Sequence, residues 1–244
     1  MIQLMGVMQG LVEKFGLRVT RSVNTLAHQR LNLIHTYHIN KVLDVGANLG
    51  QYAEWLRKGG YKGQIISFEP IPWVYDVLCK NRVQDQNFKA FQVACGDQDG
   101  EKKLHIAIGH ASSSLRQVTH CLADACQNAA QMNSVVVPLR RLDSMVQDSL
   151  NKQDRLHLKI DTQGFEMEVL LGSTHIMDLV CTLELEISLT ELYTGQALLP
   201  EIFTKIKELG FETFWIERGF LDSRTGRMLQ IDGLFVRKDL LFRS

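Results

Sequence analysis

"KVLDVGANLGQYAEWL" (residues 41–56) joins a short apolar run to a helical pattern through two glycines, Gly46 and Gly50. Glycine adopts the backbone angles of a tight turn at little steric cost and lets a ligand approach the backbone closely. A turn of this kind between a strand and a helix is typical of open α/β sheets, which bind ligands beyond the carboxyl ends of their strands. The spacing alone is a weak signal, because many strand-to-helix turns use glycine only for geometry.

Apolar runs and helical patterns alternate along the rest of the chain, which predicts an α/β fold with a doubly wound, mainly parallel sheet. The last two runs have no helix between them, so they are expected to pair antiparallel. Residues 110–133 show no strong apolar stripe and stay unassigned. The runs that read as strands are 41–46, 64–70, 89–96, 101–109, 133–142, the start of 155–173, 178–188, 212–218 and 232–238.

Length and composition indicate one globular domain with a small appendage. The chain has 244 residues, and its 27 lysines and arginines balance 27 aspartates and glutamates, so no overall field attracts nucleic acid. Five cysteines without a C-x-x-C pair favour a reducing cytoplasm over a disulfide framework or a zinc site. We expect the main domain at 41–244, preceded by a helical cap or dimer segment at 1–40.

The first residues place Ile2, Met5, Met8, Val12 and Phe15 at helical spacing, with basic residues after them. An amphipathic basic stretch of this kind lies on a membrane surface or docks onto protein, and its glycines favour docking onto the core or onto a second subunit. It has neither the basic start and cleavage site of a signal peptide nor the length of a membrane span.

Carboxylates and glycines stand at three successive strand ends. Asp44 precedes Gly46 by two residues, Glu69 ends the next strand, and Gly96 and Asp97 end the third. An acid at the second strand end is where a ribose hydroxyl pair is bound in nucleotide-binding folds. We therefore expect a nucleoside here, with Glu69 on the ribose and Gly96 and Asp97 beside an adenine.

The identity of the nucleoside follows from charge. An NAD enzyme more usually shows G-x-G-x-x-G and an unobstructed helix start for the pyrophosphate, whereas here "DVGANLG" begins with an acid. A cationic ligand suits this turn better, and we expect S-adenosylmethionine, with Asp44 and nearby carbonyls favouring its ammonium group. The residues predicted to bind the cofactor are Asp44, Gly46, Asn48, Gly50, Glu69, Pro70, Gly96 and Asp97.

Several motifs together resemble the FkbM-type S-adenosylmethionine-dependent methyltransferases over about residues 40–238. The resemblance implies a class I methyltransferase, Rossmann-like fold with seven strands and methyl transfer to an oxygen, typically on a sugar, glycan or polyketide. The motifs are "VLDVGANLGQYA", "SFEP", "ACGD", "SSSLR", "LKIDTQGFEMEVL", "LELEIS", the "LY" at 192–193 and "GRMLQIDGLFVRK", in that order. Much of the family reads D-x-E-G-x-E where this chain reads "DTQGFE", and Gln163 removes a charge there.

Methyl transfer to a hydroxyl requires a positioned acceptor and a general base, or a divalent cation that lowers the acceptor's pKa. Asp161 is the first candidate for the base, Glu186 the second, and Glu166 the third. The alternative for Asp161 is an N-cap of a helix beginning at Gly164, and the alternative for the strand acids is pairing with Lys159, Lys205 or Arg237. An Mg²⁺ ion among these carboxylates is possible, but their spacing does not establish coordination, so no metal ligand is assigned.

The expected protein is a cytoplasmic O-methyltransferase acting on a small-molecule or glycan acceptor, with no integral membrane span, no nucleic-acid partner and a possible homo-oligomer contact through the N-terminal segment. Transfer to nitrogen or to a protein side chain is one alternative. A catalytically silent nucleoside-binding interaction module is another. Cofactor turnover separates that module from the enzymes, and tolerance of Asp161→Asn would favour an amine acceptor.

Overall fold

The computed structural model describes residues 25–109 and 111–241. Its helices are α2 (Leu26–Thr36), α3 (Gln51–Lys58), α4 (Pro72–Arg82), α5 (His120–Ala125), α6 (Leu142–Val146), α7 (Glu166–Leu171), α8 (Leu199–Glu208) and α9 (Lys238–Leu241). Its strands are β1 (Lys41–Val45), β2 (Gln64–Phe68), β3 (Phe88–Phe91), β4 (Ala94–Gly96), β5 (Gly100–Ala107), β6 (Gln131–Arg141), β7 (Leu156–Ile160), β8 (Val180–Ser188), β9 (Phe211–Arg218) and β10 (Gln230–Arg237). No described helix is long and apolar enough to cross a lipid bilayer.

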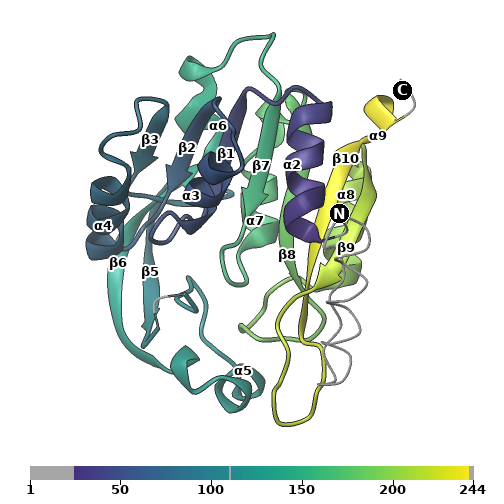
Figure 1. Cartoon of the computed structure of the whole chain (residues 1–244). Coiled ribbons are helices and arrows are strands. Elements are labelled where there is room, and N and C mark those ends of the chain that lie inside the picture. The colour runs from purple at the N-terminus through teal and green to yellow at the C-terminus, as the bar shows by residue number, and fades with distance from the viewer. Residues whose placement is uncertain (1–24, 110, 242–244) are drawn as a thin grey trace, which may run out of the picture.

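Seven strands form the main sheet in the order β3-β2-β1-β7-β8-β10-β9 (Figure 1). Neighbours pair parallel except at β10, which runs antiparallel to both β8 and β9. The order reverses direction at β1, so the carboxyl ends of β1 and β7 form the crevice where such sheets bind ligands. The predicted class I methyltransferase fold, with an antiparallel last strand, is confirmed.

Helices cover both faces of this sheet. On one face α2 and α3 bury Ile34, Ala53 and Leu56 against β1 and β2. On the other, α6, α7 and α8 join the largest apolar cluster, which includes Leu158 and Leu183 of the central strands. β7 is buried along its whole length, as expected of a parallel strand with both faces covered.

A second, three-stranded sheet has the order β4-β6-β5. It corrects the prediction of one strand at 89–96. β3 ends at Phe91 on the main sheet, and β4 begins at Ala94 with β6 as its parallel partner. The chain divides here because the backbone of β4 hydrogen-bonds to β6 of the β5–β6 hairpin, so that only the β3 part of this run pairs with β2.

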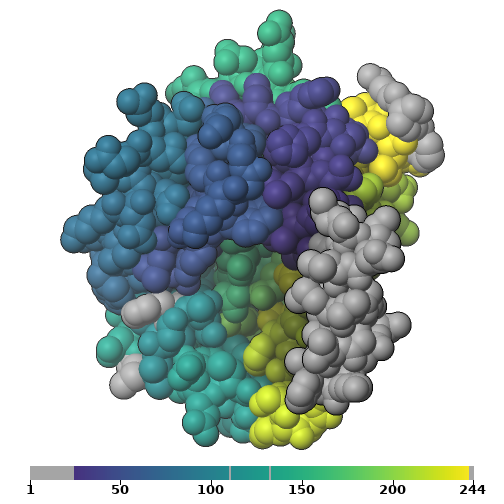
Figure 2. Space-filling model, viewed as in Figure 1, coloured from purple at the N-terminus to yellow at the C-terminus, as the bar shows by residue number. Residues whose placement is uncertain are grey.

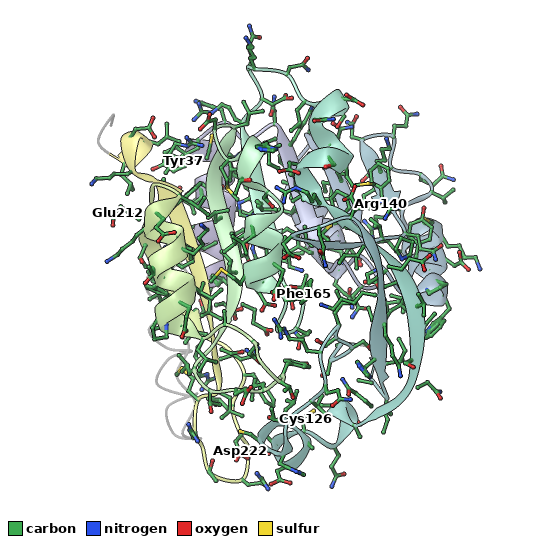
Figure 3. The ribbon with its side chains drawn as sticks, turned by 180° about the vertical axis from the view of Figure 1, so that it is seen from behind. Tyr37, Cys126, Arg140, Phe165, Glu212 and Asp222 are labelled. Atoms are coloured by element: carbon green, nitrogen blue, oxygen red, sulfur yellow. The ribbon has the colours of Figure 1, made fainter. Side chains whose placement is uncertain are left out.

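The hairpin insertion between β5 and β6 reaches across to the far end of the main sheet. It contains α5 and packs with Leu192 and Tyr193 of the loop after β8 and with Leu229 of the loop before β10. Figure 3 shows this junction from behind, with Cys126 of the insertion near Asp222 of the β9–β10 loop. The insertion and the loops thus enclose the space beyond the strand ends, and Figure 2 shows that space as a hollow with the green β7–β8 region at its floor.

The N-terminal segment is described only from residue 25. α2 begins after Thr25, whose hydroxyl accepts a hydrogen bond from the His28 N–H, and it ends at Thr36. The amphipathic pattern at residues 2–15, and therefore the contact predicted for it, lies outside the described residues.

Candidate active site

The glycine turn after β1 is held against two neighbouring loops. The Gly46 and Ala47 N–H groups both donate to the Phe68 carbonyl at the end of β2. Gly46 has φ +79°, and a Cβ on it would lie 1.9 Å from the Asp161 carbonyl oxygen. Only glycine permits this approach, which brings the β1 turn directly against the chain leaving β7.

Glu69 lies where the sequence predicts a ribose contact. Its Oε2 accepts the Asn48 N–H at 2.9 Å and its Oε1 accepts the Ile71 N–H at 2.9 Å. Burial raises the pKa of Glu69 to about 7, although these two bonds oppose the rise. Each oxygen keeps a second lone pair, so the carboxylate is able to accept hydrogen bonds from a vicinal diol.

The first pocket joins this carboxylate to an apolar wall. Aliphatic and aromatic side chains from several elements line one side of it, which suits a nucleobase and ribose carbon atoms. Figure 3 shows Phe165 at the centre of the molecule, where it forms part of this wall between α7 and the small sheet. The lining residues are Val45, Gly46, Asn48, Phe68, Glu69, Pro70, Ile71, Val74, Val93, Ala94, Cys95, Leu104, Ala111, Ser113, Ser114, Leu115, Asp161, Thr162, Gln163, Phe165 and Glu186.

The second pocket is lined by more charged side chains than the first, and it adjoins the first. Both pockets are lined by Gly46, Asn48, Asp161 and Glu186, which therefore mark their junction. The remaining residues of the second pocket are Leu26, Arg30, Ala47, Gln51, Tyr52, Trp55, Lys159, Ile160, Glu184 and Asp232. A ligand in the first pocket would thus face a ligand in the second across Asp161 and Glu186.

A row of buried charges crosses the sheet beneath the junction. Strand register places Ser67, Asp44, Lys159 and Glu184 side by side on β2, β1, β7 and β8. Lys159 Nζ lies 3.2 Å from Asp44 and 3.5 Å from Asp161, and donates to the Gly46 carbonyl at 3.1 Å. Burial would lower the pKa of Lys159, but these carboxylates hold it above its usual value, so the lysine stays cationic.

Asp44 therefore lies below the pockets. It is fully buried, lines neither pocket, and is bound to Lys159 and to the Ser67 hydroxyl. Burial raises the pKa of Asp44, and Lys159 partly offsets the rise. The direct contact with an ammonium group predicted from the sequence is therefore not prepared by this arrangement, in which Lys159 lies between Asp44 and Asp161.

Arg30 of α2 closes one side of the second pocket. Its guanidinium binds the Glu184 carboxylate through two nitrogens, one of them at 2.6 Å, and lies 4.7 Å from the Tyr52 ring centroid and 4.6 Å from that of Trp55. The Tyr52 hydroxyl donates to Glu184 at 2.9 Å and contacts His157 Nε2 at 2.8 Å. Burial would raise the pKa of Glu184, but Arg30 and His157 hold it well below its usual range.

Asp161 and Glu186 converge at the junction through Gln163. The Gln163 amide nitrogen donates to Asp161 Oδ1 at 2.8 Å and to Glu186 Oε2 at 2.7 Å. Gln230 also donates to Glu186 at 2.8 Å. Burial and then the charge of Asp161 raise the pKa of Glu186 well above the usual value. The Asp161 side chain is 39% exposed, which makes it the more accessible of the two carboxylates.

Of two alternatives drawn from the sequence, one is wrong and the other holds only in part. Asp161 is not a helix N-cap, because α7 begins at Glu166 with Phe165 as its N-cap. Of the predicted partners of the strand acids, Lys159 lies beside Glu184 in the strand register and interacts with it electrostatically, but the direct ion pair of Glu184 is with Arg30, and Glu186 binds two glutamines. Lys205 pairs with Glu208, and Arg237 donates to the Val180 carbonyl. Neither residue lines the first or the second pocket.

Other predicted site residues lie beside the pockets. The Glu166 carboxylate accepts the Thr162 and Gly164 N–H groups, so it stabilises its own loop and lines neither pocket, and burial raises its pKa to about 7. Gly50 is the N-cap of α3 and packs against Leu78. Gly96 lies against Leu139 and Phe165, while Ala94 and Cys95 just before it line the first pocket, and Asp97 lines neither pocket.

Sequence reasoning missed Arg30, Tyr52 and the central position of Lys159. Lys159 does carry a signal, because a lysine in an otherwise apolar central strand requires a buried partner. Arg30 and Tyr52 carry none, since basic and aromatic residues are ordinary on amphipathic helices. Among the described residues, no group of three or more histidine, cysteine, aspartate or glutamate side chains is arranged to hold a metal ion.

In sequence, the chain is similar to known methyltransferases. A family model described as the methyltransferase FkbM domain matches residues 44–213. The 2-O-methyltransferase NoeI of Sinorhizobium fredii is 28% identical over 169 residues, covering 66% of this chain and 68% of that protein. Methyltransferase sdnD of Sordaria araneosa is 23% identical over 198 residues, covering 70% of this chain and 73% of that one.

Among solved structures, Aeropyrum pernix fibrillarin in complex with natively bound S-adenosyl-L-methionine is 10% identical. It covers 85% of this chain and 74% of its own, with a TM-score of 0.46. At this level of likeness the fold assignment rests on the strand order given above.

Proposed function

The chain belongs to the FkbM methyltransferase family, whose model matches residues 44–213, and from that premise we propose that it transfers a methyl group from S-adenosylmethionine to a hydroxyl group of a carbohydrate or related metabolite. The observation that carries the proposal is the junction of the two pockets, where Asp161 lines both a pocket that combines Glu69 with an apolar wall and a second pocket rich in charged side chains.

The first pocket fits the cofactor. Glu69 would accept the ribose hydroxyls, and the aliphatic wall formed in part by Ile71 and Leu115 would cover the adenine. The Asn48 side-chain oxygen is buried without a hydrogen-bond partner and lines both pockets, so it offers an acceptor for the amino acid end. When bound, the cofactor supplies an electrophilic methyl group on a sulfonium sulfur.

Asp161 is the proposed general base. The acceptor hydroxyl gives its proton to the Asp161 carboxylate while its oxygen gains the methyl group and the sulfur leaves as a neutral thioether. Lys159 lies 3.5 Å from the same carboxylate and helps to fix its position. Glu186 accepts a hydrogen bond from the same Gln163 amide nitrogen as Asp161 and forms the other side of the junction.

The second pocket is the proposed acceptor site. Its carboxyl groups suit a ligand rich in hydroxyl groups, because each carboxyl oxygen accepts hydrogen bonds. α2 precedes the matched residues and contributes Leu26 and Arg30, so we assign it to the cap over this pocket. The name of the relative NoeI, a 2-O-methyltransferase, supports oxygen as the methylated atom.

The test is a product screen with isotopically labelled S-adenosylmethionine and a panel of neutral sugars, glycans, amines and proteins, run in parallel with Asp161→Asn. We expect labelled methyl ether products, and we expect the variant to lose about 100-fold or more in turnover while its cofactor affinity changes little. Methylated amines with full activity of the variant would instead establish an N-methyltransferase. Binding of S-adenosylhomocysteine without turnover of any acceptor class would favour the silent binding module.

A further inference from the structure

Gln163 stands out at the site for its backbone as well as for its side chain. It lies in the loop between β7 and α7 with φ +56°, a conformation that residues other than glycine rarely adopt. Asn48, with φ +48°, shares this feature and also lines the first pocket. Left-handed residues of this kind persist where the surrounding contacts hold them, and they concentrate at functional sites.

The polar groups of Gln163 bind four separate segments. Its amide nitrogen reaches Asp161 and Glu186, and its amide oxygen accepts the Tyr193 hydroxyl at 2.7 Å. Its backbone carbonyl accepts the Ser114 hydroxyl at 2.6 Å. The residue therefore ties together the end of β7, strand β8, the loop after β8 and the insertion of the small sheet.

The chemistry of these contacts requires an amide. An ionised carboxylate only accepts hydrogen bonds, whereas an amide nitrogen carries two hydrogens and can donate one to each neighbour. A glutamate at 163, as in the D-x-E-G-x-E pattern, would offer no such donors when ionised and would add a third negative charge. Hydrogen bonds to charged acceptors are about twice as strong as neutral ones, so the loss would be large.

We propose that Gln163 is a positioning residue that joins Asp161 and Glu186 into one pair at the junction of the two pockets by donating one amide hydrogen to each, and that its neutrality keeps a further negative charge away from the pair. The catalytic use of this pair rests on the proposed function. The pairing itself does not, and it can be measured without an acceptor.

The charges that face the pair come from every packed element. Lys159 of β7 is the nearest cation, but it is shared with Asp44. Glu166 of α7 and Asp232 of β10 add negative charge, and both raise the pKa of Glu186 after burial and Asp161. Arg30 of α2 is engaged by Glu184, and Tyr193 stays neutral because burial and then the nearby acids raise its pKa. Few positive charges near the pair are left to offset a further acid.

The experiment compares four variants with the full-length wild-type protein. Gln163→Glu changes the charge at constant size, Gln163→Ala removes the donors, and Gln163→Glu with Glu186→Gln exchanges the amide and the carboxylate across one hydrogen bond. Gln86→Glu, on an exposed loop outside both pockets, controls for the added charge. The readouts are the melting temperature at pH 6 and pH 8 and the ¹³C titration of the Asp161 and Glu186 carboxyl groups.

We expect Gln163→Glu to melt about 4–8 °C below wild type at pH 8 and closer to it at pH 6. The loss is larger at pH 8 because the new glutamate, placed beside two acids, would have a higher pKa in the folded than in the unfolded protein. Stability is then lost as pH rises through the pKa that this glutamate has in the folded protein. The titration midpoint of at least one paired carboxyl should rise by about one pH unit or more. The exchanged double variant should regain at least half of the lost melting temperature, and Gln86→Glu should match wild type.

Equal losses for Gln163→Glu and Gln163→Ala at both pH values would overturn the proposal, because they would indicate packing alone. A double variant no more stable than Gln163→Glu would also overturn it, and this holds even if Gln163→Glu does not fold. None of these readouts involves methyl transfer. A failed acceptor screen would therefore count against the proposed function and leave the pairing result intact.

Discussion

Glu69 connects local structure to ligand binding through its protonation state. Its two backbone hydrogen bonds stabilise the ionised form, but burial outweighs them and raises the pKa to about 7. In the ligand-free protein the contribution of Glu69 to the unfolding free energy is therefore fully present below its ordinary pKa of about 4.5, and it is lost as pH rises through its folded pKa of about 7. A ribose that donates hydrogen bonds to the carboxylate would oppose that trend.

We predict that affinity for S-adenosylhomocysteine rises with pH across this range. The ionised Glu69 carboxylate accepts ribose hydroxyls more strongly than the acid, so the dissociation constant should fall by about fivefold to tenfold between pH 6 and pH 8. Calorimetric titration at a series of pH values measures it. Glu69→Gln should bind more weakly with a flatter profile, and an equally steep profile in this variant would assign the titration to another group.

At the scale of elements, the turn between β1 and α3 depends on close approach as well as on backbone angle. The Gly46 carbonyl accepts Lys159, its N–H binds the end of β2, and its Cα faces the chain leaving β7. Gly60, after α3, has a similar φ of +89°, but a Cβ there would have no neighbour within 4 Å. The two glycines therefore separate conformational strain from steric exclusion.

We predict that Gly60→Ala destabilises the protein by about 1–2 kcal/mol, the cost of a left-handed L-residue. Gly46→Ala should cost about 4 kcal/mol or more, because the Asp161 carbonyl must also move away from the added methyl group. It should also weaken S-adenosylhomocysteine binding by more than about tenfold. Urea unfolding and calorimetry measure both quantities, and equal effects of the two substitutions would contradict the close approach.

At the scale of the whole molecule, the mainly parallel sheet with its antiparallel last strand and the glycine turn were predictable, whereas the pairing within the site was not. Apolar runs with turn residues identify β1, β2, β7 and β8, because short-range pattern and burial agree there. The division at 91–94 was missed because "KAFQVACG" reads as one apolar run, and its partner strand lies far away in the chain. Asp44, Glu69 and Asp161 were found as acids at strand ends, but the partners of each depend on register and helix placement.

The first pocket is formed by both sheets, so the cofactor should stabilise them jointly. Glu69 and Ile71 come from the end of β2, while Leu104 and Leu115 come from the β5 hairpin and its insertion. A ligand present at about 100 times its dissociation constant adds about 2.7 kcal/mol to the unfolding free energy, which corresponds to about 5–10 °C in melting temperature for a chain of this size.

We therefore predict that S-adenosylhomocysteine raises the melting temperature by this amount and that NAD at the same concentration does not, because the turn offers its pyrophosphate no complementary charge. Hydrogen exchange should slow in both walls, at the β1–α3 turn and around Leu104 and Leu115 in the hairpin and its insertion, while α8 and β9, which line neither pocket, stay unchanged. Protection confined to the glycine turn would mean that the small sheet does not close the nucleoside site. Protection of both walls would show that the insertion, the part of the chain with the weakest sequence pattern, completes the cofactor pocket.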